Sequence, residues 1–119
     1  MAENYPDFHA EMVSLVTNLR DKLSGPMSGY GELHAAATRD AALSRKFKEL
    51  IALGIAIAIQ CEGCIVYHVH DALDAGATRD EILETVGVAV MMGGGPAVIY
   101  GAQVLEALEQ FEAEGVDTR

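Results

Sequence analysis

Two cysteines, Cys61 and Cys64, are the only ones in the chain and form a Cys-x-x-Cys pair. A two-residue gap lets the sulfurs meet when the first cysteine begins a helix and the second lies one turn further on. His68 follows Cys64 by four residues, so a helix would place both side chains on one face. Paired thiols beside an imidazole can carry redox chemistry or bind a metal ion, and we expect the chemistry of the protein here.

The surroundings of each thiol decide whether it reacts, because the attacking species is the thiolate and the free cysteine pKa is about 8.5. Cys61 is expected at the first turn of a helix, where backbone N–H groups favour a negative sulfur. Cys64 is expected one turn further on, where His68 can take its proton. Glu62 works against thiolate formation unless it points to solvent.

Glu49 is a second candidate for proton chemistry, because it lies in an apolar stretch about three helical turns before the cysteines. The spacing permits contact between Glu49 and His68 without requiring it. The competing interpretation of Glu49 is a salt bridge to a nearby base, namely Arg45, Lys46 or Lys48. These bases oppose the dipole at the start of their helix, a cost that acids on a neighbouring helix or subunit could offset.

Two other interpretations of the cysteine pair stay open. Zinc could be held by both thiolates with His68 and either His70 or Glu49, but the second ligand pair typical of a structural zinc site is missing. The pair could also be inert, or could sense redox state in a non-enzymatic oligomeric module. His70 lies about 200° around the helix from His68, which predicts that it and Asp71 form a solvated surface pair. We expect His9 at the surface, and His34 either on a helix surface or as a packing residue.

The length of 119 residues predicts one domain over 1–119, of which 1–27 hold an N-terminal helix. The chain has no Trp and few aromatic residues, so Ala, Ile, Leu, Val and Met must build the core, which favours packed helices. The net charge of −10 repels phosphate backbones and anionic lipid surfaces, so we expect neither nucleic acid nor membranes as partners.

The first twelve residues lack the basic and apolar regions of a signal peptide, and the longest apolar run is about half a membrane span. We therefore expect a soluble, cytoplasmic protein. In a reducing compartment two cysteines favour redox chemistry or metal binding over a structural disulfide.

Helical periodicity and capping residues predict an all-α fold of about six helices. Ser24-Gly25-Pro26 is expected to stop the first helix, Ser44 to cap the third and Thr78 with Glu81 to cap the fifth. The expected helices cover 6–23, 44–59, 62–75, 81–92 and 97–111, with a weaker segment, which could form two short pieces, over 27–40. More apolar helix surface is present than one small domain can hide, so we expect a homo-oligomer.

The pattern Glu49, Cys61-x-x-Cys64, His68, followed by Ala75-Gly76-Ala77-Thr78 and Met92-Gly93-Gly94-Gly95-Pro96, resembles the carboxymuconolactone decarboxylase family in its alkylhydroperoxidase D-like branch. The resemblance is strongest over 40–105. It implies an all-helical domain that assembles as a homotrimer or homohexamer.

The resemblance also implies a thiol-dependent, antioxidant peroxidase of peroxiredoxin type, in which Cys64 is the peroxidatic and Cys61 the resolving cysteine. Glu49 and His68 match a proton relay that deprotonates Cys64, an external dithiol restores the thiols, and no metal or organic cofactor is required. Gly63 stands where well-studied peroxidases of the family carry a histidine, so general disulfide reduction by the same cysteines is the alternative. The resemblance is weaker evidence for lactone decarboxylation, because the decarboxylases of the family generally lack the cysteine pair.

Overall fold

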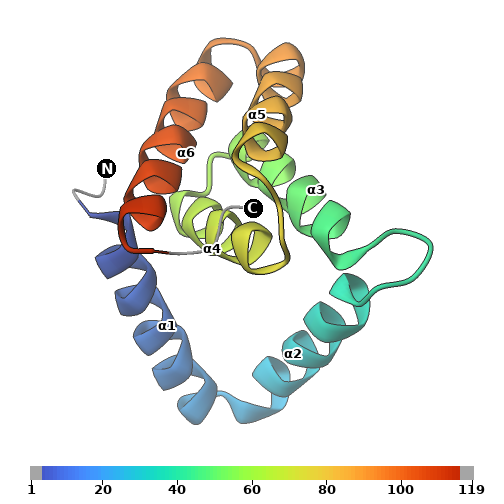
Figure 1. Cartoon of the computed structure of the whole chain (residues 1–119). Coiled ribbons are helices and arrows are strands. Elements are labelled where there is room, and N and C mark those ends of the chain that lie inside the picture. The colour runs from blue at the N-terminus through green and yellow to red at the C-terminus, as the bar shows by residue number, and fades with distance from the viewer. Residues whose placement is uncertain (1–3, 116–119) are drawn as a thin grey trace.

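The computed structural model describes residues 4–115, and within them every regular element is an α-helix. Figure 1 shows the helices in chain order. They are α1 (Tyr5–Lys22), α2 (Ser24–Thr38), α3 (Arg45–Ala58), α4 (Glu62–Asp74), α5 (Arg79–Gly93) and α6 (Gly95–Ala113). The predicted all-α fold with the cysteine pair at the start of a helix is confirmed.

Local side-chain chemistry starts four of these helices, the first being α1, where Asn4 Oδ1 accepts the backbone N–H of Asp7 at 2.8 Å. The Ser44 hydroxyl accepts the backbone N–H of Phe47 at 3.2 Å and caps α3. Thr78 and Glu81 form a reciprocal capping box at α5. Cys61 caps α4 with its sulfur, so the predicted reactive pair also defines where its own helix begins.

The segment after α1 differs from the prediction, because Ser24-Gly25-Pro26 starts a helix as well as following one. The helix α1 ends at Lys22 and α2 begins at Ser24, then continues without a break to Thr38. Pro26 is tolerated because it lies in the first turn of α2, where backbone N–H groups have no partner within the helix. The weaker segment is therefore one helix and not two pieces.

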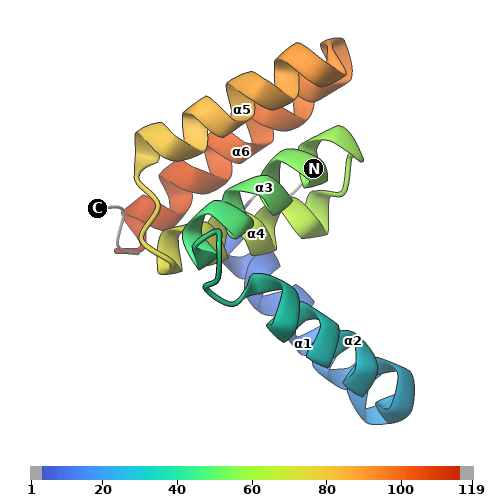
Figure 2. The same cartoon turned by 90° about the vertical axis from the view of Figure 1, so that its right-hand side faces the viewer.

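The core lies between α3, α4, α5 and α6, which pack closely against one another in both views (Figures 1 and 2). Leu53 and Ile57 of α3 and Val69 of α4 are completely buried there. Further core side chains are Ile65, Val66, Leu73, Ile82, Val104, Leu108 and Phe111. These aliphatic contacts hold the α3–α4 pair in a fixed position, and both helices contribute to the site described below.

The bases at the start of α3 face acids on neighbouring helices, as expected from their unfavourable position at a helix N-terminus. Arg45 lies 3.3 Å from the Asp74 carboxylate of α4, and Lys46 lies 2.9 Å from the Glu81 carboxylate of α5. These ion pairs offset the dipole cost locally and connect the first turn of α3 to both neighbours.

A hairpin of α1 and α2 forms a V that extends away from the other four helices (Figures 1 and 2). Tyr5 is the buried residue of α1, its backbone N–H donates to Gln110 Oε1 at 2.6 Å, and α2 has no fully buried residue. Several apolar side chains of the hairpin are exposed, among them Leu19 and Leu33. The hairpin thus adds little to the core of a single chain.

Over residues 4–115, none of the helices combines the length and the apolar character that a membrane-spanning helix requires.

The contact between α5 and α6 depends on Gly101, because a Cβ there would lie 2.7 Å from Val86 Cγ1. We expect Gly101→Ala to lower the free energy of unfolding by about 1 kcal/mol or more, since a branched side chain next to a helix cannot move away freely. The control is Gly29→Ala in α2, where a Cβ meets nothing within 4 Å. That variant should gain roughly 0.5–1 kcal/mol from lower backbone entropy in the unfolded state. Urea denaturation of both variants measures this, and an equal effect in both would contradict the packing argument.

Candidate active site

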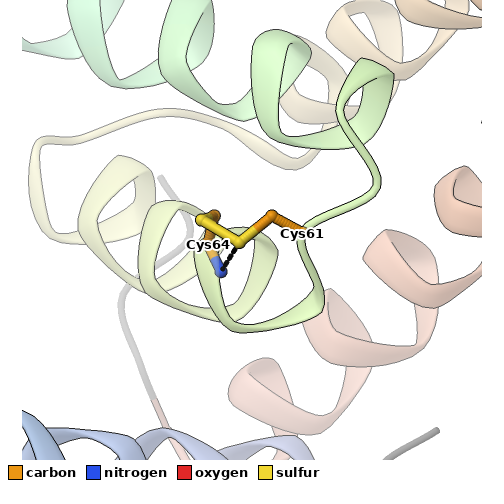
Figure 3. Close-up of a disulfide and its surroundings, with 2 residues drawn as sticks. All are labelled: Cys61 and Cys64. Carbon is orange, nitrogen blue, oxygen red and sulfur yellow. Dashed lines mark hydrogen bonds between the residues drawn. A yellow bond between two sulfur atoms is a disulfide. The ribbon is translucent and has the colours of Figure 1, made fainter.

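The two cysteines are joined by a disulfide at the N-terminus of α4, with an S–S distance of 2.07 Å (Figure 3). The backbone N–H of Cys64 donates to Cys61 Sγ at 3.2 Å. A helix N-terminus stabilises negative charge, so the same position would favour a thiolate on Cys61 after reduction. Both residues are half-buried and can therefore be reached from solvent.

Glu49 and His68 are brought together by the packing of α3 on α4. His68 Nδ1 lies 2.9 Å from Glu49 Oε1, and the Glu49 side chain is only 1 % exposed. The second carboxylate oxygen of Glu49 is 3.9 Å from Arg45 Nε. One oxygen of Glu49 thus contacts His68, and the other lies near Arg45, which is one of the bases named in the salt-bridge interpretation.

A cavity of about 570 Å³ connects these groups, because Cys61, Cys64, His68 and Asp71 all line it. Gly63 and Tyr67 of α4 also line it, and the rest of the wall, which is largely apolar, comes from the α1–α2 hairpin. It includes Met12, Val16 and Arg20 from α1 and Met27, Tyr30 and His34 from α2. The site is thus formed between a rigid pair of core helices and the hairpin.

His70 and Asp71 are a pair as predicted, but they are partly buried instead of solvated. His70 Nδ1 lies 3.0 Å from Asp71 Oδ1. The His70 ring stacks on His9 of α1, with ring centroids 4.2 Å apart, and both rings contact Phe111 edge-on. The prediction of surface positions for His9 and His70 is wrong because α1 and α6 pack against this face of α4.

Asp71 also approaches the pair formed by Glu49 and His68. A ring nitrogen of His68, a carboxylate oxygen of Glu49 and a carboxylate oxygen of Asp71 all lie within 4.8 Å of one another. Burial alone would raise the pKa of Asp71, but the hydrogen bond with His70 and the charges of His70, His68 and Arg45 outweigh it and lower that pKa. The Asp71 carboxylate is therefore ionised at neutral pH.

The Glu62 carboxylate lies near the buried ring of Tyr5 of α1. Burial first, and the charge of Glu62 second, raise the pKa of the Tyr5 phenol to about 12. Glu62 is half-buried and does not line the cavity that contains both cysteines. Its carboxylate is thus on the α1 side of the helix start and not simply directed to solvent.

A zinc site on both thiolates is not formed in this structure, because the two sulfurs are bonded to each other. Glu49, His68 and Asp71 are close enough to share a cation. The hydrogen bond between Glu49 and His68 and the packing of α3 on α4 explain why these two are close, and Asp71 lies near His68 because it follows it by three residues on α4.

The family model of the carboxymuconolactone decarboxylase family matches residues 27–107. The chain belongs to this family. An uncharacterized protein of Cupriavidus necator, H16_B0147, is 34 % identical over 87 residues, which is 73 % of this chain and 77 % of that protein. The family match covers α2 to most of α6 and leaves α1 outside.

Solved structures of carboxymuconolactone decarboxylase family proteins have the same fold. Apo-lpg0406 of Legionella pneumophila is 43 % identical, with a TM-score of 0.86 over 90 % of this chain and 96 % of that one. TM1620 of Thermotoga maritima, suggested to take part in an antioxidative response, is 27 % identical, with a TM-score of 0.71 over 76 % and 93 % of the two chains.

Asp71 and Arg20 are the site residues that sequence reasoning missed. Asp71 follows His68 by three residues, and this helical spacing was a usable signal that both share a face. Arg20 had no such signal, because its place in the cavity wall depends on how the hairpin lies against α4.

His9 gives the protein a pH-dependent contribution to stability. Burial, followed by the charge of His70, lowers the pKa of His9 from 6.5 in the folded protein. As the pH falls below about 6.5 the unfolded chain therefore binds this proton first, and stability is lost. We expect the wild-type melting temperature to fall between about pH 7.5 and about pH 5, and to fall less in His9→Phe, whose ring cannot titrate.

His70 acts in the opposite direction, because its hydrogen bond to Asp71 raises its pKa. Its stabilising contribution is fully present below about pH 6.5 and is lost as the pH rises through the folded pKa. The hydrogen bond to Asp71 does not involve His9, so the difference between the melts of wild type and variant reports His9 together with its charge coupling to His70. Identical pH slopes would contradict the assignment.

Proposed function

We propose that the protein is a thiol-dependent peroxidase that reduces hydroperoxides with Cys64 and Cys61, using His68 and Glu49 as a proton relay. The observation that carries this proposal is the 2.9 Å hydrogen bond between Glu49 and His68 at the cavity that both cysteines line. Cleavage of a peroxide needs a base for the thiol and an acid for the departing alkoxide. One imidazole that takes the first proton and returns it serves both steps.

The relay assigns a separate task to each imidazole nitrogen. An ionised Glu49 carboxylate can only accept, so His68 Nδ1–H donates to it and Nε2 is left as the base for the Cys64 thiol. Contact with a buried carboxylate also stabilises the imidazolium that forms.

The cycle then has three balanced steps. The Cys64 thiolate attacks one peroxide oxygen, the O–O bond breaks, and the proton held by His68 converts the leaving alkoxide to an alcohol, which leaves a sulfenic acid. The Cys61 thiol releases its proton and its sulfur attacks the Cys64 sulfur, the S–O bond breaks, and the leaving hydroxide takes up that proton to form water. An external dithiol reduces the disulfide by two thiol–disulfide exchanges. The disulfide in this structure corresponds to the oxidised enzyme before that last step.

A peroxide-consumption assay with an organic hydroperoxide and a small dithiol tests the proposal. Cys64→Ser should abolish turnover, because no sulfenic acid can form. In the absence of the dithiol, Cys61→Ser should consume about one equivalent and leave a sulfenic acid that a dimedone-type reagent traps on Cys64. His68→Ala should slow turnover by about 100-fold and Glu49→Gln by less, since general acid–base catalysis contributes on that order.

His34→Ala is the matched control, because His34 lines the same cavity and is outside the proposed relay. It should retain wild-type turnover. Consumption of peroxide that persists in Cys64→Ser would overturn the mechanism.

The second candidate is a general disulfide reductase, and the position of Cys61 favours it. The Cys61 sulfur accepts a hydrogen bond from the backbone N–H of Cys64 at the N-terminus of α4. This arrangement favours the thiolate and so activates a thiol for attack on an external disulfide. Gly63, in place of a loop histidine, removes one proton donor from peroxide cleavage. In this case the wild type would reduce a small-molecule disulfide without consuming peroxide, and Cys64→Ser would trap the substrate on Cys61 as a mixed disulfide.

We also propose that residues 1–119 form one domain that works in the cytoplasm as a homo-oligomer, a trimer or hexamer. Isolated chains expose an apolar groove of about 860 Å³ between α3 and α5, which includes Ile51, Ile55, Val88 and Met92. Ile55 is 55 % and Met92 is 77 % exposed. Exposed apolar surface of this kind is typical of an interface, and a second copy of the chain is the occupant that fits the family.

Ile55→Asp should dissociate the oligomer, because burying an unpaired carboxylate at an apolar interface is unfavourable. Light scattering after size exclusion should give the mass of a single chain or a smaller assembly. The control, Ala113→Asp at the exposed end of α6, should leave the mass unchanged. A wild-type protein that already elutes as one chain would exclude the oligomer.

A further inference from the structure

Asp71 is an ionised group at the site that the proposed cycle does not use. Its carboxylate lines the cavity together with Cys61, Cys64 and His68. One of its carboxylate oxygens lies within 4.8 Å of a ring nitrogen of His68 and of a carboxylate oxygen of Glu49. The Asp71 side chain is 24 % exposed. His68 therefore has two carboxylates near it, Glu49 from α3 and Asp71 from its own helix.

The Asp71 carboxylate is held in its orientation by a hydrogen bond with His70 and not by His68. His70 Nδ1 is hydrogen-bonded to Asp71 Oδ1, and the His70 ring is held between His9 of α1 and Phe111 of α6. Three helices thus hold a surface-accessible carboxylate in one place. A group that only increased solubility would need no such support.

Other titratable and charged groups surround Asp71 and His68. They are Arg45 and Glu49 on α3, His9 and Arg20 on α1, His34 on α2, and Tyr67, His70 and Asp74 on α4. His70 Nδ1 donates to Asp71 Oδ1, and Arg45 lies near Glu49, so both bases act on the carboxylates that face His68.

We propose that Asp71 is a positioning residue that stabilises His68 in its protonated form after His68 has taken the proton of Cys64. This inference rests on the proposed function, because it assigns Asp71 to the same relay. A negative charge near an imidazolium favours it, and the Cys64 thiolate then persists because its proton stays on His68. Asp71 acts on the sulfur through His68 and does not touch the reacting atoms.

The sign of the effect separates this role from a simple charge effect. Acting directly through space, the negative charge of Asp71 would disfavour the Cys64 thiolate, so its removal would make the thiolate form at lower pH. Acting through His68, Asp71 favours the thiolate, so its removal should make the thiolate form at higher pH. The two roles predict opposite shifts of the same curve.

The test is the pH profile of iodoacetamide alkylation of Cys64 in the reduced protein, with Cys61→Ser as the background. Asp71→Asn should move the half-maximal rate to higher pH and lower the rate at neutral pH several-fold. Asp71→Glu should restore part of the rate, because it returns a carboxylate. The matched control is Asp80→Asn, which removes one charge from an exposed residue of α5 and should leave the profile unchanged.

A second pair of variants tests whether the effect passes through His68. In a His68→Ala background, Asp71→Asn should no longer move the profile to higher pH. A shift to lower pH or no shift in the His68-containing protein would overturn the role of Asp71, as would an unchanged shift without His68.

The same data distinguish failure of this inference from failure of the proposed function. If His68→Ala alone leaves the alkylation profile of Cys64 unchanged, the relay itself is wrong and the role of Asp71 is excluded with it. If His68→Ala shifts the profile and Asp71→Asn does not, the relay stands and only Asp71 is excluded. Circular dichroism of each variant shows that the comparison is made between folded proteins.

Discussion

The hydrogen bond between Glu49 and His68 is the interaction on which both the fold and the site depend. Glu49 is almost completely buried on α3, beside the core residues Leu50 and Leu53. A buried carboxylate is unfavourable unless it has a partner, and His68 supplies that partner for Glu49. The packing that buries Glu49 must therefore also hold His68 of α4 in place, so the position of the imidazole next to the cysteines follows from the core.

Much of the fold could be predicted from the sequence because its signals are local. Helical periodicity defines the apolar faces, and the caps at Ser44 and Thr78 need only residues within one turn. The Cys61–Cys64 contact is local for the same reason. The start of α2 was misjudged because proline and glycine after a helix usually indicate an end, whereas the first turn of a new helix accepts both.

The parts of the site that the sequence could not define are those that depend on tertiary packing. The spacing in the sequence allows contact between Glu49 and His68, but the way in which α3 packs on α4 decides whether the two side chains meet. The contact between His9 and His70 joins residues far apart in the chain, and nothing local to either one indicates the other. Helical geometry predicts correctly that His70 lies on a different face of α4 from His68. It does not reveal that α1 and α6 pack against that face.

The hairpin has a consequence for how this family can diverge. The cysteines, His68 and Glu49 belong to core helices inside the matched region 27–107, whereas Met12, Val16 and Arg20 of the cavity wall belong to α1, outside it. Substitutions at exposed hairpin positions disturb few core contacts, so they are inexpensive in stability. A change of Met12, Val16 or Arg20 would therefore alter the cavity wall while leaving the core helices that carry the cysteines, His68 and Glu49 in place.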